Sequence, residues 1–340
     1  MRMNTLRRKT SHGARSLGPA VGGLVFLLIA SLLIFVPPAS SAAKDWPSKP
    51  ISLIVPWTAG GGTDRAARFM APRLSKMLGV PIMVVNKPGA SGITGTLEAV
   101  KSPPDGYTLL MDCNGGSSIQ HAWHRDLPYK VAERTFIARV MYNPLCVIVP
   151  ASSPWKTMDD LANTIRTNPS SISYGAGAGA PDVPINQFLA ALAAKGVDVS
   201  KTRAVTFKGS GDINPAVAGG HLSFSVAGVS AINPLVSAGK VRPLAVSSHE
   251  RYKGWPNVPT TAEAGYPTVN GIFWASLGGP PGLPAHIVKT LDDGVREILK
   301  DPEARAGLEK MDFFPFYLST DAFKKFVMDE GESIKALKLK

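Results

Sequence analysis

The residues with the clearest potential for chemistry are three consecutive glycines, Gly60–Gly62, in the stretch PWTAGGGTDRAARFM. They follow an apolar run, Ile51–Val55, that is typical of a buried strand, and precede a helical pattern over Asp64–Leu78. A helix N-terminus presents backbone N–H groups without intrahelical partners and a partial positive charge. Glycine lets an anion approach those groups because it has no Cβ. The stretch therefore indicates an anion-binding turn, suited to a carboxylate or a phosphate.

A second glycine-rich loop, KPGASG at Lys87–Gly92, repeats this arrangement between a predicted strand at Pro81–Val85 and a predicted helix. A turn and a third strand follow at Pro103–Met111. This β-α-β-α-β order is typical of a parallel sheet, so both loops are expected at its carboxyl edge, where ligands bind. We interpret Asp64 as a cap of the first helix, with Thr63 as the alternative cap, and not as a catalytic acid.

Other anion and catalytic motifs do not fit. GGGTDR lacks the GK[ST] of a phosphate-binding loop, and the second strand ends in Asn86–Lys87 where a dinucleotide fold needs an acid. GAGAGAPD at Gly175–Asp182 has glycines without the full dinucleotide spacing, so a flexible turn and a ligand contact both stay open. No GxSxG elbow occurs, and we interpret His121 and His124 as a polar helical surface. The sequence thus predicts no catalytic residue, no metal site and no cofactor.

The N-terminus has the pattern of an export signal. Met1–Ser16 contains five basic residues and no acidic one. An uncharged apolar stretch covers Val21–Val36, and small residues follow Pro37–Pro38. We predict a cleaved signal peptide over residues 1–43 and a periplasmic mature chain; the alternative is an uncleaved anchor, although the stretch is shorter than the ~20 residues of a spanning helix.

Composition narrows the remaining classes. The 340 residues are 44% hydrophobic and 18% charged, which permits a sizeable core. Removing residues 1–43 takes away five basic residues and no acidic one, which lowers the formal charge from +12 to +7. No long run of like charge occurs, so we expect no nucleic-acid partner. An exported chain permits a disulfide between Cys113 and Cys146, but two buried thiols are the favoured interpretation.

The alternation of strands and helices continues to the C-terminus. Two strands, near Leu145–Val149 and Phe273–Gly278, are placed to carry the chain between lobes. We therefore expect two α/β lobes around a cleft: a discontinuous lobe of residues 44–147 plus 272–340, and a second lobe of residues 148–271. The further predicted strands are Leu145–Pro150, Ser171–Gly175, Ala204–Phe207, Leu222–Val226 and Leu244–Ser247, and the further predicted helices are Thr157–Thr167, Asp182–Lys195, Ala285–Leu299 and Thr320–Leu337.

The combined motifs resemble the Bug family, the TctC-like periplasmic solute-binding components of tripartite tricarboxylate transporters. The similarity covers the opening WPSKPISLIVPWTAGGGTDRAARFM and continues, in matching order, at VTFKGSGD, AGKVRPLAVSS, WPNVPTTAEAGYP and GGPPGLPAHIV. The resemblance implies a type II periplasmic-binding fold, two doubly wound lobes with a central ligand cleft that closes like a flytrap. It implies a small carboxylate ligand and no enzymatic activity.

The resemblance also implies the binding residues, largely through backbone groups. They are Trp57, Thr58, Ala59, Gly60, Thr63 and Asp64 in the first loop, Gly89, Ala90, Ser91 and Gly92 in the second, Asn114 after the third strand, and Ala176, Gly177, Ala178, Lys208, Ala227 and Gly228 in the other lobe. This chain departs from the family where Ser223 replaces a common acid, which favours a ligand without an amino group, such as a di- or aromatic carboxylate. Trp57 and Phe273–Trp274 are candidates for stacking on it, with burial in the core as the alternative.

We therefore predict a monomeric periplasmic protein that captures a small carboxylate for the inner-membrane transporter subunits. Presentation of the ligand to a sensor kinase is an alternative role. Two other classes stay open on the residues alone: an exported α/β enzyme acting on a small acid, and a binding module for phosphorylated ligands. The sequence does not identify the carboxylate.

Overall fold

A computed structural model describes residues 46–337 of the chain apart from 125, 178, 208 and 209. The predicted signal peptide over residues 1–43 lies outside the described residues. The strands are β1 (Ile51–Val55), β2 (Ile82–Asn86), β3 (Thr108–Cys113), β4 (Thr135–Pro150), β5 (Ser173–Ala176), β6 (Arg203–Thr206), β7 (Ser225–Gly228), β8 (Val241–Val246), β9 (Ile272–Gly279) and β10 (Phe314–Leu318). The helices are α2 (Gly62–Leu78), α3 (Ile93–Lys101), α4 (Ser118–Trp123), α5 (Met158–Thr167), α6 (Asp182–Ala193), α7 (Ser210–Ala218), α8 (Val229–Ser237), α9 (Ala285–Lys300), α10 (Pro302–Glu309) and α11 (Thr320–Ala336).

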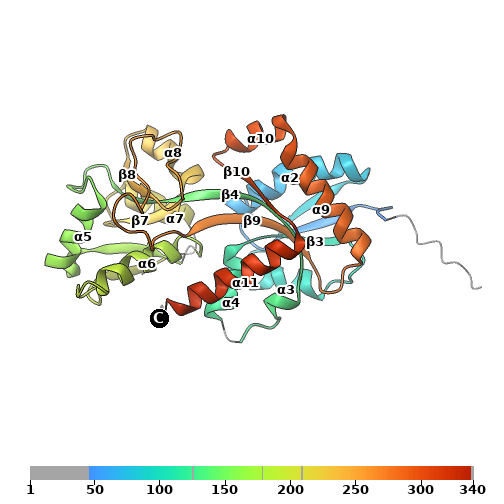
Figure 1. The fold of residues 1–340 in the computed structure, drawn as a ribbon, viewed down its shortest axis with the longest axis horizontal. Coiled ribbons are helices and arrows are strands. Elements are labelled where there is room, and N and C mark those ends of the chain that lie inside the picture. The colour runs from blue at the N-terminus through green and yellow to red at the C-terminus, as the bar shows by residue number, and fades with distance from the viewer. Residues whose placement is uncertain (1–45, 125, 178, 208–209, 338–340) are drawn as a thin grey trace, which may run out of the picture. The chain divides into compact units, whose positions relative to one another are not determined.

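The predicted parallel β-α-β-α-β unit is confirmed. β1 pairs in parallel with β2 on one side and with β3 on the other, and the sheet continues through β9 and β4 to β10. The helices α3, α4 and α11 cover one face of this sheet, and α2 and α9 cover the other (Figure 1). Both predicted glycine-rich loops therefore follow the carboxyl ends of adjacent strands.

Strand β4 is much longer than the sequence suggested. We predicted a strand only over Leu145–Pro150, whereas β4 begins at Thr135. Its first part pairs with β9 and β10, and its last part pairs with β7 and β8. The missed part contains Arg139, which is 1% exposed because its guanidinium stacks on the rings of Phe316 and Phe326, at 3.7 and 4.5 Å from their centroids. A charged residue inside a strand hid the apolar pattern.

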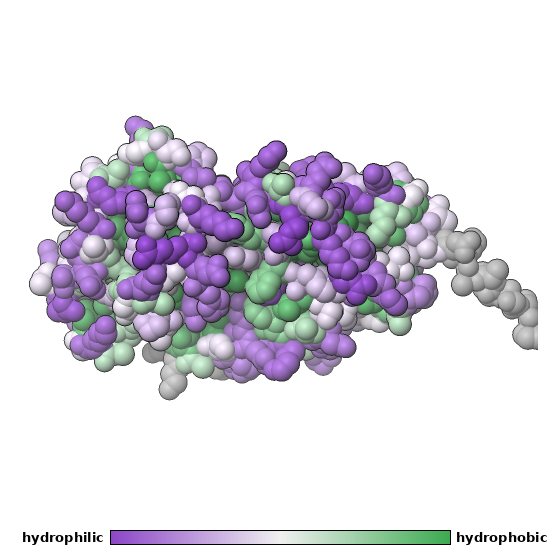
Figure 2. All heavy atoms as spheres, turned by 45° about the horizontal axis from the view of Figure 1, so that its top comes forward, coloured by the Kyte–Doolittle hydropathy of each residue, from purple (hydrophilic) through white to green (hydrophobic). Residues whose placement is uncertain are grey.

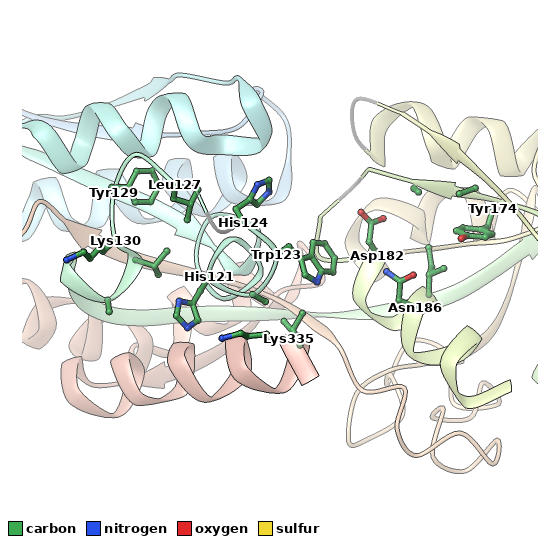
Figure 3. Close-up of a pocket in the computed structure, with 17 residues that line it drawn as sticks. His121, Trp123, His124, Leu127, Tyr129, Lys130, Tyr174, Asp182, Asn186 and Lys335 are labelled. Carbon is green, nitrogen blue, oxygen red and sulfur yellow. The ribbon is translucent and has the colours of Figure 1, made fainter. Parts of the chain in front are cut away.

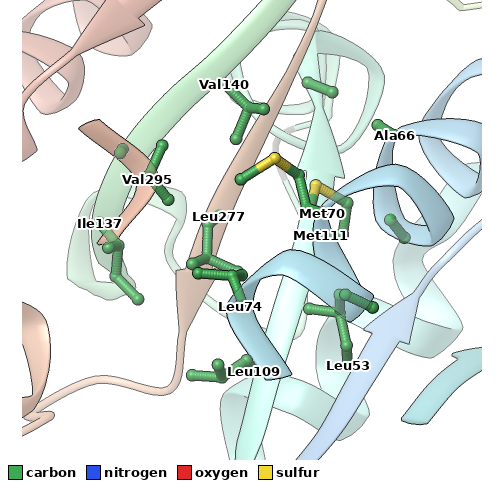
Figure 4. Close-up of a cluster of buried hydrophobic side chains, with 14 of the residues drawn as sticks. Leu53, Ala66, Met70, Leu74, Leu109, Met111, Ile137, Val140, Leu277 and Val295 are labelled. Carbon is green, nitrogen blue, oxygen red and sulfur yellow. The ribbon is translucent and has the colours of Figure 1, made fainter. Parts of the chain in front are cut away.

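The core follows the two-residue period of the strands. Leu53, Leu109 and Met111 point from the sheet towards α2, where Met70 and Leu74 meet them (Figure 4). The intervening residues Ile54 and Leu110 form a separate small cluster with Ala99 of α3. Helices on both faces therefore bury both sides of β1 and β3, which is why these strands read as continuous apolar runs.

Several predicted boundaries need correction. Helix α2 begins at Gly62 with Gly61 as its N-cap, so neither Thr63 nor Asp64 is the capping residue. Strand β7 begins at Ser225, three residues later than predicted, although Phe224 makes an isolated bridge to Tyr174. Helix α10 and strand β10 were not predicted. The proposed lobe boundaries at residues 147 and 271 stay a prediction.

Most of the visible surface is polar, and both cysteines are buried. Polar side chains cover most of the face shown in Figure 2, with smaller hydrophobic areas between them. Cys113 and Cys146 are both free and buried, so the favoured interpretation of two buried thiols is confirmed. Burial raises the pKa of Cys113 to about 12. Among the described helices, none is both long and apolar enough to cross a membrane.

Candidate ligand-binding site

The first glycine-rich loop is held by side chains beneath it. The carboxylate of Asp64 accepts hydrogen bonds from the N–H of Gly60 (2.8 Å), from Nε of Arg68 (3.0 Å) and from Nδ2 of Asn86 (2.9 Å). Asn86 Nδ2 also donates to the carbonyl of Trp57 at 3.1 Å. Asp64 thus shapes the loop from the third position of α2, one turn later than a capping residue would.

These bonds decide the charge of Asp64. The side chain is 2% exposed, and burial alone would raise the pKa of its carboxyl. The hydrogen bonds from Arg68, the Gly60 N–H and Asn86 outweigh that effect and hold the pKa below its usual value. Asp64 is therefore ionised, and its carboxylate is already occupied by hydrogen-bond donors of the protein. The N–H groups of Gly62, Thr63 and Asp64 in the first turn of α2 have no intrahelical partner and give this end of the helix a partial positive charge.

The second loop is shaped mainly by its backbone. Four successive residues have positive φ: Gly89 (141°), Ala90 (46°), Ser91 (53°) and Gly92 (90°). Non-glycine residues rarely adopt such values, and conformations of this kind cluster at functional sites. One side chain supports the loop, since Nε2 of the buried Gln120 donates to the carbonyl of Ser91 at 2.9 Å.

The Trp57 indole joins the loops. A Cβ on Gly92 would lie 3.0 Å from Cζ2 of Trp57, and a Cβ on Gly115 would lie 2.9 Å from the same atom. Gly115 belongs to the 3₁₀ turn Asn114–Gly116 after β3. A Cβ on Gly179, in the loop after β5, would lie 3.9 Å from the Cα of Gly115. Glycines thus let the turns after β2 and β3 pack against the ring that the turn after β1 supplies, and Gly179 brings the turn after β5 close to the turn after β3.

Two further polar groups hold the Asn114–Gly116 turn. Nη1 of Arg134 donates to Asp112 Oδ2 (2.9 Å) and to the carbonyl of Gly116 (3.2 Å), and Ser117 Oγ donates to the same Asp112 oxygen at 2.7 Å. Asp112 and Arg134 are both buried. This ion pair fixes the turn from below.

A half-buried glutamate lies against α4. Glu330 of α11 accepts hydrogen bonds from Ser118 Oγ and from Nε1 of Trp274, the latter at 2.9 Å. Burial raises the pKa of Glu330 to about 7, although those bonds and the charge of Arg139 act against the rise. Trp274 is 0% exposed, so it belongs to the core and is not available to stack on a ligand. The ring of Phe273 packs against the backbone of Gly62.

The other predicted binding residues fall into three groups. Thr58, Ala59, Gly60 and Gly89–Ser91 are exposed on the two loops, while Asn114 is 3% exposed and donates to the carbonyl of Ile272 at 2.8 Å. Ala227 and Gly228 end β7, where a Cβ on Gly228 would lie 3.1 Å from Oδ1 of Asn143. Ala178 and Lys208 lie outside the described residues. Whether any of them binds a ligand stays a prediction.

The loop after β5 is held from α6. The carboxylate of Asp182, the first residue of α6, accepts hydrogen bonds from the N–H groups of Gly177 (3.1 Å) and Gly179 (3.2 Å). Helix α6 begins at Asp182, where the predicted helix begins, and Pro181 is its N-cap. The carboxylate orders the glycine turn before the helix.

A cavity of about 1480 Å³ adjoins this loop (Figure 3). It lies between α4 with the segment after it on one side and β5 with α6 on the other, and Ala176 is the one predicted binding residue on its wall. This cavity was not predicted, because its walls come from separate parts of the chain. Within the described residues, no group of His, Cys, Asp and Glu side chains is arranged to hold a metal ion.

Asn86, Gln120 and Arg134 were missed as supporting residues. Asn86 was noted only because it is not acidic. Its position at the end of β2 was a usable signal. A side chain at the carboxyl end of one parallel strand can reach the loop that follows the neighbouring strand, which here is β1. Gln120 and Arg134 gave no comparable signal.

Known proteins share this architecture. The structure of Rpa4515 from R. palustris with adipate is 30% identical, with a TM-score of 0.79 over 86% of this chain and 97% of that one. The periplasmic binding protein BugD is 25% identical, with a TM-score of 0.75 over 86% and 97%. In sequence, the UPF0065 protein in the gbd 5' region of Cupriavidus necator is 32% identical over 91% of this chain and 92% of its own.

The fold is thus that of a periplasmic solute-binding receptor. The profile of the tripartite tricarboxylate transporter family receptor matches residues 66–339. The chain belongs to this family, and the resemblance to Bug proteins is confirmed. These proteins are receptors and not enzymes, which removes the alternative of an exported enzyme.

Proposed function

We propose that this protein captures a small carboxylate at its two glycine-rich loops and delivers it to the membrane subunits of a tripartite tricarboxylate transporter. The observation that carries the proposal is that the turns after β2 and β3 pack against Trp57 of the turn after β1, and that the turn after β5 approaches the turn after β3 at Gly115. The unpaired N–H groups at the start of α2 supply partial positive charge there. That a relative of 30% identity was solved with adipate supports a carboxylate over a phosphate.

The proposed contacts are the predicted ones. Thr58, Ala59, Gly60 and Thr63 would present the first loop, and Gly89–Gly92 the second. The other lobe would close onto the ligand and bring Ala176–Gly177 and Ala227–Gly228 towards it. The chain would bend where β4 and β9 pass from one lobe to the other, as hinged domains do. Asp64 would act through the loop it shapes, because its carboxylate already accepts three hydrogen bonds.

A thermal-shift screen tests the proposal. Mono-, di-, tri- and aromatic carboxylates are added to the purified protein, with phosphate and nucleoside monophosphates as the contrasting set, and hits are measured by calorimetry. At least one carboxylate is expected to raise the melting temperature, with a shift that grows as the logarithm of its concentration above the dissociation constant. Shifts with phosphates alone would overturn the carboxylate proposal in favour of a phosphate-binding module.

Export and cleavage are part of the same proposal. The basic and apolar pattern of residues 1–43 supports removal of this segment after Ala43. Mass spectrometry of the protein from a periplasmic fraction is expected to find Lys44 at the N-terminus. Recovery of the uncut chain in the membrane fraction would contradict it.

A further inference from the structure

Asp312 occupies a backbone position that glycine usually fills. Its N–H donates to the carbonyl of Glu309 at 2.9 Å, and the N–H of Phe313 donates to that of Leu308 at 3.0 Å. These two bonds form the Schellman motif that ends α10, in which the residue of positive φ is most often glycine. Gly79 ends α2 with a φ of 72°, whereas Asp312 adopts a φ of 57° with a side chain. Because aspartate is less favourable than glycine in this conformation, the contacts of its side chain are informative.

The Asp312 carboxylate connects the last part of the chain to two segments of the predicted second lobe. Its Oδ1 accepts a hydrogen bond from the hydroxyl of Tyr252, and its Oδ2 accepts one from Nδ2 of Asn233 in α8 at 3.1 Å. Both donors belong to the predicted lobe of residues 148–271, whereas Asp312 belongs to the other. The carboxylate is thus a bridge between the two predicted lobes.

The Asp312 backbone contacts the strand that passes between the lobes. Its carbonyl accepts a hydrogen bond from Nδ2 of Asn143 in β4 at 2.9 Å. Asn143 pairs with Phe273 of β9, and two residues later Leu145 pairs with Gly228 of β7. Asn143 therefore lies where β4 changes partners, which is where the proposed bending takes place.

Other contacts fix the turn between α10 and β10 on both sides. Nη2 of Arg65 donates to the carbonyl of Met311 at 3.1 Å, and its guanidinium lies 4.8 Å from the centroid of the Phe313 ring. Arg65 is the fourth residue of α2, so this contact reaches the helix that follows the first glycine-rich loop. On the other side, Phe314 packs on Tyr252 with ring centroids 6.2 Å apart. The turn therefore links that helix to the predicted second lobe.

The conformation with these contacts also brings the two predicted lobes together at the candidate site. A Cβ on Gly179, after β5, would lie 3.9 Å from the Cα of Gly115, after β3. A ligand that needs groups from both lobes binds best to the arrangement in which those groups are already close. Contacts that favour this arrangement therefore raise the affinity without touching the ligand.

We propose that Asp312 is a positioning residue that holds the two lobes at the angle at which both reach the ligand, through its bonds to Tyr252 and Asn233. The inference rests on the proposed function and adds a determinant of affinity outside the two loops. Loss of these bonds lets β4 and β9 bend over a wider range, so the protein spends less time in the binding arrangement.

Distances between two spin labels test the inference on the ligand-free protein. Lys76→Cys on α2 and Ala193→Cys on α6 carry the labels, because both residues are exposed and lie in different predicted lobes, whereas the two natural cysteines are buried (Figure 1). Asp312→Gly is the main variant, since glycine suits the positive φ and only the carboxylate is lost. Its distance distribution is expected to be broader than that of the natural chain. Tyr252→Phe, which keeps the ring and loses the hydroxyl, is expected to act in the same direction.

Tyr266→Phe is the matched control. The hydroxyl of Tyr266 donates to Asp159 at 2.8 Å, and both residues lie within the predicted second lobe. This variant loses the same kind of bond, so its distance distribution is expected to match that of the natural chain. Equal broadening in Tyr266→Phe and Tyr252→Phe would show a general loosening and would overturn the inference.

Calorimetry with adipate measures the effect on binding. Asp312→Gly and Tyr252→Phe are each expected to weaken adipate binding about fivefold, and Tyr266→Phe to change it less than about twofold. Tighter binding by Asp312→Gly, or an unchanged distance distribution, would overturn the inference and leave the proposed function intact. Failure of every carboxylate to bind the natural chain would overturn the proposed function, while the label distances would still decide whether Asp312 holds the lobes.

Discussion

The two glycine-rich loops are held in their conformations by different interactions. In the first loop, Asp64 and Asn86 make a network of side-chain hydrogen bonds to the backbone. In the second, four consecutive residues at positive φ set the shape, and Gln120 contributes one bond. The first loop is therefore sensitive to loss of polar side chains, and the second to any added Cβ. The same apparent motif in a sequence can thus have different weak points.

The largest effect is expected from Gly89→Val in the second loop. Gly89 has a φ of 141°, and a Cβ there would lie 2.7 Å from Oγ1 of Thr94. Valine cannot keep this backbone, so carboxylate affinity is expected to fall at least about hundredfold, or ~2.7 kcal/mol. The overall fold should stay, because the residue is exposed. Calorimetry with a circular dichroism control measures both; unchanged affinity would show that this loop is not the site.

In the first loop, Asp64→Asn is expected to cost both stability and affinity. An amide cannot accept all three hydrogen bonds of the carboxylate, which leaves a buried donor unpaired at a cost of about 1–3 kcal/mol. Affinity is expected to fall about tenfold as Gly60 loses its position. Chemical denaturation and calorimetry measure the two effects. A complete loss of binding at unchanged stability would instead mean that Asp64 contacts the ligand.

Acid titration separates Asp64 from the rest of the chain. Its pKa in the folded protein is lowered, so its contribution to stability is present above the unfolded value of about 3.9 and is lost as pH falls through the folded pKa. The melting temperature of the natural chain should therefore fall more steeply below pH 4 than that of Asp64→Asn. Parallel curves for the two proteins would contradict the role of the ionised carboxylate.

A smaller effect is expected from Gln120→Leu, which removes the side-chain bond to the second loop that is seen among the described residues. The carbonyl of Ser91 and the hydroxyl of Tyr129 both lose a partner. Because the loop is set mainly by its backbone, affinity should fall only about threefold, although stability falls by about 1–2 kcal/mol. Affinity lost as strongly as in Asp64→Asn would show that the loops do not differ as described.

The smallest effect is expected from Gly60→Ala. Its φ of 82° is strained for alanine, but no atom lies within 4 Å of the added Cβ. The cost should be about 1 kcal/mol of stability, with affinity changed less than about twofold. Calorimetry measures the affinity and urea denaturation the stability. A large loss of affinity would show that the ligand fills the open space where the added Cβ of residue 60 would lie, and it would make both loops equally intolerant of side chains.

The sequence predicted features that depend on nearby residues. β1 and the helix after it were found because apolar spacing and glycine boundaries are local signals. The first part of β4 was missed because it contains the charged Arg139. The burial of this side chain depends on stacking with Phe316 and Phe326, which lie far along the chain. The loops were located for the same local reasons, whereas the bonds of Asn86 and Gln120 depend on the folded arrangement.

The long strand β4 has a consequence for unfolding. Its sixteen residues pair with β9 and β10 in one part and with β7 and β8 in the other. Loss of either set of partners would leave β4 with exposed, unpaired backbone groups next to the surviving set. The two halves should therefore melt cooperatively, as one transition whose calorimetric and van't Hoff enthalpies agree. A chain divided into two α/β halves would then behave, on heating, as a single thermodynamic unit.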